Sequence, residues 1–497
     1  MHHLTLVARS ALLATLAASA LITALPAAHA ATATSGASVA WLQAAADADI
    51  ERAFAQAKAD KKPVLLYWGA KWCPPCNQLK ATLFNRADFI ERSKSFVAVN
   101  IDGDLPGAQK LGGRFKVRGY PTMILMAPDG TELTRLPGEV DAPQIMAVLQ
   151  LGLAGGRPVK AVLADARAGK PVSGPEWRSL AFYGWDIDEA QLVSATERAG
   201  LLAQLSTACP ATEADAATRL LLKALAESDD GKGIKPDAAL RERVRKLLAD
   251  PVAARAQMDV VTNNAVDITK ALAPAPGADR VAMAGAFDAA LQRLEADASL
   301  SRADRLGALI ARVQLARIDG PKDALLPKLP PALVQRVRDH VARDDKEITD
   351  AYERQVVITA AAYALTAAGL WAESDALLKS NLAKSHSPYY LMSQLAGNAR
   401  KQGRKDEALR CAGTKRPTPR AKARPPGCSG ARATSARWSS WHRRTPRASS
   451  GWPASCLPKP ARTRRPSTSA VRAHCNAWAP SWPSGTRAAS MTPRCAG

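Results

Sequence analysis

Between residues 40 and 155, hydrophobic positions alternate between helical spacing and the unbroken runs of buried strands. Helical spacing covers residues 39–61 and 73–92, a short helix is predicted over 108–115, and a last one over 141–153. Strands are predicted at 63–68 and 96–101, and residues 122–126 and 131–136 form a hairpin around a Pro-Asp-Gly turn. This order predicts an α/β fold, a mixed sheet with helices on both faces.

Residues 160–410 show helical spacing only, so an all-α region is predicted to begin after Gly155-Gly156-Arg157-Pro158. Helix breakers recur through it, namely Gly231, Pro236, Pro251, Pro274, Gly320 and Pro330. Near its end, Gly369 and Gly403 are 34 residues apart. The stretch 403–409 resembles the helix–turn–helix turn of tetratricopeptide repeats, which have this period.

The first thirty residues are typical of a secretory signal peptide. His2, His3 and Arg9 precede the apolar run 11–26, which ends at Ala28-His29-Ala30. A membrane anchor is the alternative, but the run is rich in alanine and shorter than the ~20 residues needed to span a bilayer. We therefore predict cleavage after Ala30, no transmembrane segment in the mature chain, and a periplasmic location, which is oxidising.

The net charge of +23 over 497 residues suggests a polyanionic partner until it is divided by position. Residues 411–497 contain 17 Lys and Arg and no Asp or Glu, so residues 1–410 carry only +6. A net charge this small over residues 1–410 does not call for a nucleic-acid partner, and we expect none. Eight cysteines in this length also exclude a disulfide scaffold.

The composition of residues 411–497 changes so sharply that the reading frame itself is in question. As written, the segment is predicted to be a disordered basic tail, although five Trp and five Cys are unusual for disorder. Cys and Trp codons both begin with TG, so a frame one base earlier replaces them by Leu, Val or Met. We therefore hypothesise that 411–497 is a frame-shifted reading of a further helical repeat, which the nucleotide sequence would test.

The strongest chemical motif is Trp72-Cys73-Pro74-Pro75-Cys76, which follows a predicted buried strand and opens a helix. A Cys-x-x-Cys pair on a first helical turn brings two sulfurs together. The helix start and Lys71 favour a thiolate at Cys73, and Cys76 is placed to resolve a mixed disulfide. Pro74 and Pro75 each lack an N–H, which removes donors to that thiolate.

Other interpretations of Cys73 and Cys76, as a metal site or as an inert buried pair, are weaker. Two Cys supply only half of a tetrahedral zinc site and no nearby Cys or His pair completes it, so we expect no metal. The pair carries electrons by itself, and no cofactor is expected. Cys209, beside a proline near a helix end, is interpreted as a small core residue rather than as a redox partner.

Pro121 supports the redox reading. It begins a strand 45 residues after Cys76, within Gly119-Tyr120-Pro121-Thr122. A proline there is able to hold a cis bond and leave the Tyr120 backbone available to bind a peptide.

Residues 40–155 resemble the thioredoxin family, especially periplasmic domains of thiol:disulfide interchange proteins, through the stretches 64–80, 96–102 and 117–126. The resemblance implies a thioredoxin fold, with Cys73 as nucleophile, Cys76 as resolving thiol and Pro121 as the cis-proline. Trp72 would form the rim of the site, and Tyr120 would pair its backbone with the substrate.

The sequence departs from the family at one position. Thioredoxins carry a buried carboxylate six residues before the nucleophile, where this chain has Tyr67. Proton transfer at Cys76 then uses water or another group, with Glu91 and Asp102 as candidates.

We therefore predict four segments: a signal peptide (1–30), a thioredoxin-like domain (31–155), an α-helical domain (156–410) and the tail (411–497). The predicted function is an exported thiol–disulfide oxidoreductase that acts on protein thiols and disulfides, with the reductase direction slightly favoured. Its electron donor would lie in the periplasm or membrane. The alternative is a helical-repeat binding scaffold or chaperone whose thioredoxin-like domain turns over little.

Overall fold

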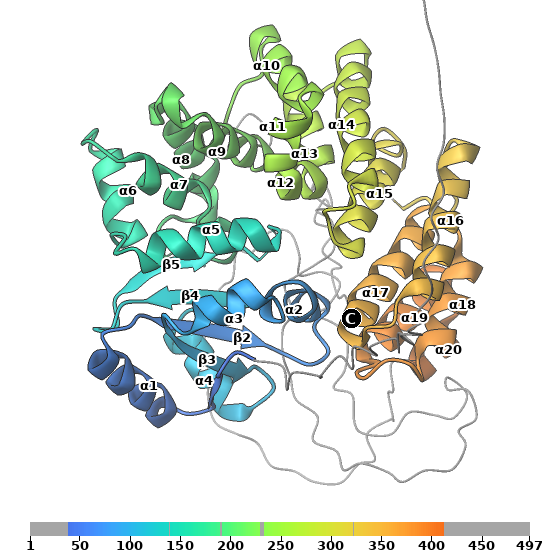
Figure 1. The fold of residues 1–497 in the computed structure, drawn as a ribbon. Coiled ribbons are helices and arrows are strands. Elements are labelled where there is room, and N and C mark those ends of the chain that lie inside the picture. The colour runs from blue at the N-terminus through green and yellow to red at the C-terminus, as the bar shows by residue number, and fades with distance from the viewer. Residues whose placement is uncertain (1–37, 139, 189–190, 229–232, 322, 412–497) are drawn as a thin grey trace, which may run out of the picture. The chain divides into compact units, whose positions relative to one another are not determined.

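The computed structural model describes residues 38–138, 140–188, 191–228, 233–321 and 323–411 (Figure 1). The predictions for the signal peptide and for residues 412–497 lie outside these residues. Five strands form one sheet: β1 (Leu42–Ala44), β2 (Val64–Gly69), β3 (Val97–Asp102), β4 (Thr122–Met126) and β5 (Glu132–Leu136).

The sheet has the order β1-β3-β2-β4-β5. β3 pairs in parallel with both β1 and β2, while β4 pairs antiparallel with β2 and β5. The predicted mixed sheet is therefore confirmed, and β2, which leads into the cysteines, is its central strand.

The helices that interleave with the strands are α1 (Asp47–Asp60), α2 (Pro74–Leu79), the π-helix η1 (Lys80–Phe84), α3 (Ala87–Ser93), α4 (Pro106–Arg114) and α5 (Ala142–Leu153). Asp141 caps α5, as expected, by accepting a hydrogen bond from the Gln144 N–H at 3.2 Å.

The strand β1 was not predicted. It lies inside the stretch 39–61, whose hydrophobic spacing predicts a helix, and α1 occupies most of the rest of that stretch. Three residues are too few to display a period of two, and β1 exists because it pairs with β3, with Leu42 opposite Val99.

The single helix expected over 73–92 is also wrong, because it is divided into α2, η1 and α3. Asn85 and Arg86 lie between η1 and α3 and belong to neither helix. Phe84 and Phe89, on either side of this break, are buried in the same core, with ring centroids 5.4 Å apart.

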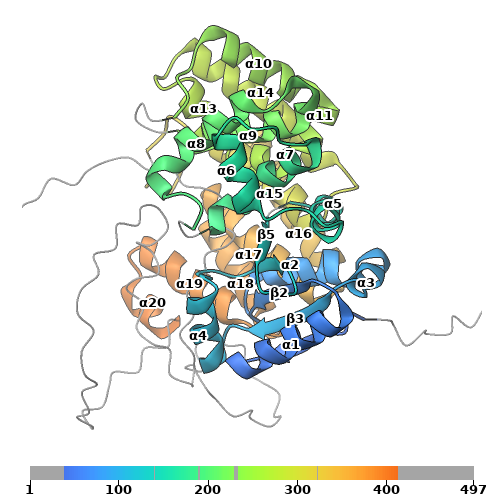
Figure 2. The same ribbon diagram turned by 90° about the vertical axis from the view of Figure 1, so that its left-hand side faces the viewer.

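Two hydrophobic cores cover the two faces of the sheet (Figures 1 and 2). α1 and α4 pack on the face that carries Leu66 and Trp68, and both cysteines belong to that core. The opposite face, with Leu65, is covered by α5 and by helices that follow it, through residues such as Trp177. Helices on both sides of residue 155 thus share one core, and the domain boundary there stays a prediction.

Beyond α5, helices are the regular elements of the described chain, as the hydrophobic spacing predicted. They are α6 (Val159–Arg167), α7 (Gly174–Ala181), η2 (Trp185–Ile187), α8 (Ala195–Ala208), η3 (Ala211–Glu213), α9 (Ala214–Ala226), α10 (Ala238–Ala249), α11 (Pro251–Ala256), α12 (Met258–Asn263), α13 (Ala265–Leu272), α14 (Ala278–Ala296), α15 (Arg302–Leu315), α16 (Pro331–Glu347), α17 (Ala351–Ala367), α18 (Trp371–Asn381), α19 (Tyr389–Lys401) and α20 (Lys405–Cys411).

The 34-residue spacing has a local structural counterpart. Gly369 and Gly403 follow α17 and α19 with φ of 82° and 75°, the left-handed conformation that glycine adopts most readily after a helix. α18 and α20 then begin 34 residues apart. The likeness to tetratricopeptide repeats remains a prediction. Cys411, assigned to the tail from sequence, is the buried last residue of α20.

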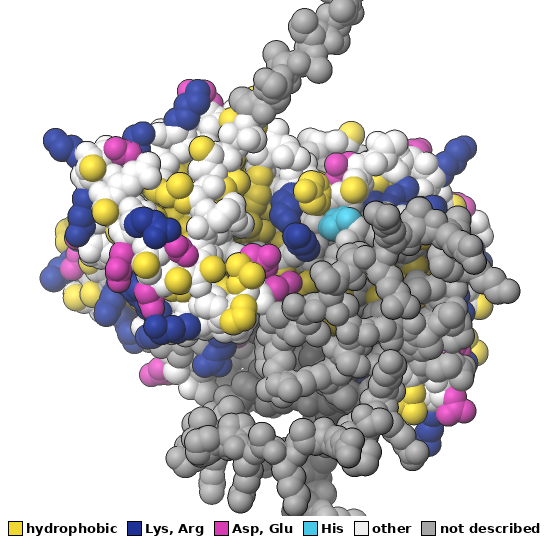
Figure 3. All heavy atoms as spheres, turned by 90° about the horizontal axis from the view of Figure 1, so that it is seen from below, with side chains coloured by type: hydrophobic (Ala, Val, Ile, Leu, Met, Phe, Trp, Pro, Cys, Tyr) yellow, Lys and Arg dark blue, Asp and Glu magenta, His cyan; other side chains and the backbone are white. Residues whose placement is uncertain are grey.

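The described surface carries charges of both signs. On the face in Figure 3, Lys and Arg side chains are interspersed with Asp and Glu over the part that described residues form. No helix of the described chain combines the length and apolar character that a membrane crossing needs.

Candidate active site

The two motif cysteines lie where the central strand passes into a helix. β2 ends at Gly69, and Cys73 is the N-cap of α2, so the helix begins at Pro74, where a missing N–H costs nothing. Cys73 and Cys76 form a disulfide with their Cα atoms 5.2 Å apart. The Cys76 N–H points at Cys73 Sγ at 3.3 Å, so after reduction it would stabilise a thiolate at that sulfur.

The predicted supporting residues surround this turn. Pro74 and Pro75 are buried in the first turn of α2, whereas Lys71 is exposed. The Lys71 carbonyl accepts a hydrogen bond from Asn77 Nδ2 at 3.0 Å, and the same amide donates to the Cys73 carbonyl at 2.8 Å. Asn77 therefore holds the motif's backbone, a role that sequence reasoning missed although this residue directly follows Cys76.

The loop before β4 faces the cysteines. The Tyr120–Pro121 peptide bond is cis, and the Tyr120 carbonyl oxygen lies 3.5 Å from Cys73 Sγ. The Tyr120 hydroxyl donates to the Gly103 carbonyl at 3.1 Å and accepts from Gln109 Nε2 at 3.3 Å. The fold thus brings Tyr120 and Pro121 to the disulfide, while their part in binding substrate remains a prediction.

Gly103 has no side chain because the Tyr120 ring occupies that space: a Cβ built there would collide with the ring. We predict that Gly103→Ala displaces Tyr120 and lowers the free energy of unfolding by about 1–3 kcal/mol, measured by urea denaturation. Gly113→Ala is the matched control, since a Cβ at Gly113 meets nothing within 4 Å. Equal stability of the two variants would contradict the packing argument.

Trp72 is fixed by a carboxylate that sequence reasoning did not single out. Its indole Nε1 donates to both oxygens of Asp104, each at 3.0 Å. Burial raises the pKa of the Asp104 carboxyl; the Trp72 hydrogen bond opposes this rise and the charge of Asp102 adds to it. The one feature of the sequence that could have indicated this role is that Asp104 lies just past the end of β3.

The position of the family's buried carboxylate is filled by an aromatic group. The Tyr67 ring packs against Trp41 and Phe84, with centroids 5.7 and 4.9 Å away. Its buried hydroxyl has no hydrogen-bond partner among the described residues. Burial raises the pKa of Tyr67, and the Asp102 charge adds to this, so the hydroxyl stays protonated at neutral pH and takes no proton from Cys76.

The two alternative proton carriers lie in different surroundings. Asp102 ends β3 opposite Gly69, at the end of the sheet where the motif begins. Glu91 is an exposed residue of α3 that pairs with Lys94 at 2.5 Å. Of the two, Asp102 is the group at the motif's end of the sheet.

Residues more than 300 positions away complete the surroundings of the motif. Trp72 contacts Tyr389 and Tyr390, the first residues of α19. His386 Nε2 lies 3.2 Å from the Lys71 carbonyl oxygen. No local pattern identifies these residues, because they are ordinary positions at the start of a helix and in the loop before it.

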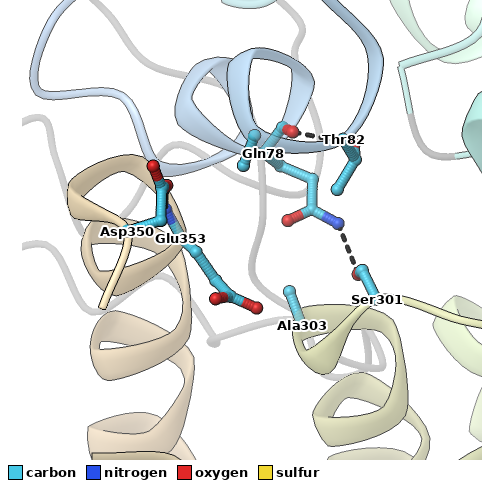
Figure 4. Close-up of a pocket in the computed structure, with 7 residues that line it drawn as sticks. Gln78, Thr82, Ser301, Ala303, Asp350 and Glu353 are labelled. Atoms are coloured by element: carbon cyan, nitrogen blue, oxygen red, sulfur yellow. Dashed lines mark hydrogen bonds between the residues drawn. The ribbon is translucent and has the colours of Figure 1, made fainter. Parts of the chain in front are cut away.

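A cavity of about 160 Å³ lies beside α2, between the motif helix and the later helices (Figure 4). Gln78 Nε2 donates to Ser301 Oγ at 2.7 Å across it, while Asp350 is the N-cap of α17 and Glu353 lies in the first turn of that helix. Its lining residues are Gln78, Ala81, Thr82, Ser301, Ala303, Asp350 and Glu353. Within the described chain, no three His, Cys, Asp or Glu side chains are grouped to hold a metal ion.

Comparisons with known proteins find similarity within the first part of the chain. The sequence profile of the thioredoxin-like domain family matches residues 50–152. The thiol:disulfide interchange protein DsbD of Pseudomonas fluorescens is 34% identical over 107 residues, which are 21% of this chain and 18% of that protein. The chain therefore spans less than a fifth of the length of that relative.

Two thioredoxins match over most of their own length. That of Pseudomonas aeruginosa is 30% identical over 96 residues, 19% of this chain and 83% of that protein. The solved structure of a thioredoxin from Thermus thermophilus is 26% identical, covers 20% of this chain and 80% of its own, and has a TM-score of 0.19. The sequence match to the P. aeruginosa protein, together with the profile match, shows that this chain belongs to the thioredoxin family.

Proposed function

We propose that this chain is an exported thiol–disulfide oxidoreductase that exchanges disulfides with protein substrates, with the reductase direction slightly favoured. The observation that carries the proposal is the Cys73–Cys76 disulfide at the start of α2, facing the carbonyl that precedes Pro121. The relation to thiol:disulfide interchange proteins supports the reaction class. The relation to those proteins and the signal-like sequence of residues 1–30 support export.

In the reductase direction, the Cys73 thiolate attacks one sulfur of a substrate disulfide and releases the other as a thiolate, leaving a mixed disulfide. The Cys76 thiolate then attacks Cys73 Sγ and releases the second substrate sulfur. Two electrons have passed to the substrate, and the chain is left with the Cys73–Cys76 disulfide. A dithiol donor in the periplasm or membrane would reduce it again.

The Cys76 thiol must lose a proton before the second step. Tyr67 does not serve as the base, because its own hydroxyl is buried and protonated. We propose that water or Asp102 accepts the proton of the Cys76 thiol; Asp102 lies at the end of the sheet where the motif begins.

The test combines turnover with a redox titration. With dithiothreitol as donor, we expect the full chain to accelerate the reduction of insulin disulfides. The Cys73–Cys76 pair should be more reducing than glutathione when its oxidised fraction is measured over a series of glutathione ratios. A pair far more oxidising than glutathione would contradict the reductase direction.

The competing function is a binding scaffold or chaperone with little turnover. The full burial of both cysteines favours it, because a buried sulfur cannot meet a protein disulfide. Absence of insulin turnover at every redox poise would select this alternative.

A further inference from the structure

The redox site is closed in this structure. Cys73 and Cys76 are both 0% exposed, and α17 of the helical region packs against α2. Attack on a protein disulfide requires the incoming sulfur to reach Cys73 Sγ along the S–S axis. The arrangement described above therefore does not admit a protein substrate.

Aromatic side chains of α19 hold Trp72, the residue next to the nucleophile. The Tyr390 ring is stacked on the indole, with centroids 5.9 Å apart and planes inclined by 17°. The Tyr389 ring meets it edge-on at 5.7 Å. Both distances are in the range at which aromatic pairs attract each other.

Further contacts lie on either side of Trp72 along the motif. His386 Nε2 is 3.2 Å from the Lys71 carbonyl oxygen. The His386 ring packs against Tyr352 with centroids 5.5 Å apart, and Lys80 Nζ lies 5.3 Å from the centroid of that same ring. We call Tyr352, His386, Tyr389 and Tyr390 the cap.

We infer that the cap is a movable cover over the redox site and that a protein substrate reaches Cys73 only after the cap leaves Trp72. The contacts described above are ring pairs, a cation–π contact and a polar contact, and Tyr389 and Tyr352 remain 46% and 38% exposed. Contacts of this kind are individually weak and separable. The inference rests on the proposed function, because it describes how that function's site is controlled.

The test measures access to Cys73 without requiring turnover. The protein is reduced, and alkylation by iodoacetamide and by a polymer-linked maleimide is followed by mass spectrometry at the peptide that contains Cys73, since the chain has eight cysteines. The pH is set above the titration of the thiol, so that every variant is compared as thiolate. In Tyr389→Ala/Tyr390→Ala we expect alkylation to be about tenfold faster, because both ring pairs on Trp72 are lost.

Two controls make the result specific. Tyr389→Phe/Tyr390→Phe keeps both ring pairs on Trp72 and should therefore react more slowly than the alanine variant. Val252→Ala/Val281→Ala removes two exposed apolar side chains far along the chain from the cap and should leave the rate unchanged. Circular dichroism verifies that each variant is folded. If the alanine variant is unfolded, the cap is tested on the unmodified chain by comparing its alkylation rates with the two reagents. The cap predicts that iodoacetamide reacts much faster with Cys73 than the polymer-linked maleimide does.

Each outcome separates the cap from the proposed function. Equal alkylation rates in the alanine variant and the unmodified chain would overturn the cap, whether or not insulin is reduced. Faster alkylation in the alanine variant alone supports the cap even if insulin turnover is absent, in which case only the proposed function fails.

Discussion

Cys73→Ser is expected to reduce disulfide exchange to less than about a thousandth of the unmodified rate, because a serine hydroxyl is not a nucleophile at neutral pH and forms no disulfide. Cys76→Ser should behave differently. Cys73 can still attack, but nothing resolves the product, so mixed disulfides with substrate accumulate. Non-reducing electrophoresis with mass spectrometry detects these adducts, and insulin turnover measures the rate.

Cys209→Ser is the matched control. Burial raises the pKa of the Cys209 thiol to about 11, with Glu213 adding to the rise, so this thiol stays protonated and unreactive. Turnover should therefore be unchanged. Loss of activity in Cys209→Ser equal to that in Cys73→Ser, or trapped adducts in both single variants, would contradict the assigned roles.

Asp259→Ala is expected to lower the free energy of unfolding by about 3–5 kcal/mol, because it leaves the buried guanidinium of Arg219 without its carboxylate partner. Arg219 of α9 donates to both Asp259 oxygens, at 2.8 and 2.6 Å, and both side chains are 1% exposed. Arg219 also donates to the Ala181 carbonyl and lies over the Phe182 ring, 4.1 Å from its centroid. Urea denaturation at pH 7 measures the loss.

Glu373→Ala is the matched control for burial. Arg338 reaches Glu373 at 2.8 Å in a similar forked arrangement, but the two side chains are 42% and 43% exposed. Exposed pairs contribute at most about 1 kcal/mol, so this variant should lose little stability. A loss as large as that of Asp259→Ala would contradict the dependence on burial.

The buried pair also predicts a pH dependence. Burial alone would raise the pKa of Asp259, but the charge and hydrogen bonds of Arg219 outweigh it and hold the pKa below its usual value. A depressed pKa in the folded state contributes stability above the unfolded value of about 3.9, which is lost as pH falls toward the folded pKa. Arg219→Met/Asp259→Leu, which removes both charges, should retain stability at pH 7 and lack this acid-dependent part.

Prediction from sequence succeeded where a local pattern extends over several residues. Residues 122–126 are the strand they were predicted to be, and Asp141 caps the helix expected there. It failed at β1 and at η1, because three paired residues and one widened helical turn leave no repeat in the hydrophobic pattern. The supporting residues Asn77 and Asp104 were missed because single polar residues beside a motif resemble ordinary loop and helix positions.

The sequence by itself determined the reactive group. A Cys-x-x-Cys pair after a buried strand dictates a sulfur at a helix start, since strand, turn and helix are all encoded within a few residues. Only the tertiary structure decided whether that sulfur can be reached. Lys71 and His386 lie 315 residues apart, and Trp72 meets Tyr390 of α19, a helix that contacts α17, which itself packs on α2. Contacts at such separation depend on how complete helices pack, and no pattern within a short segment carries that information.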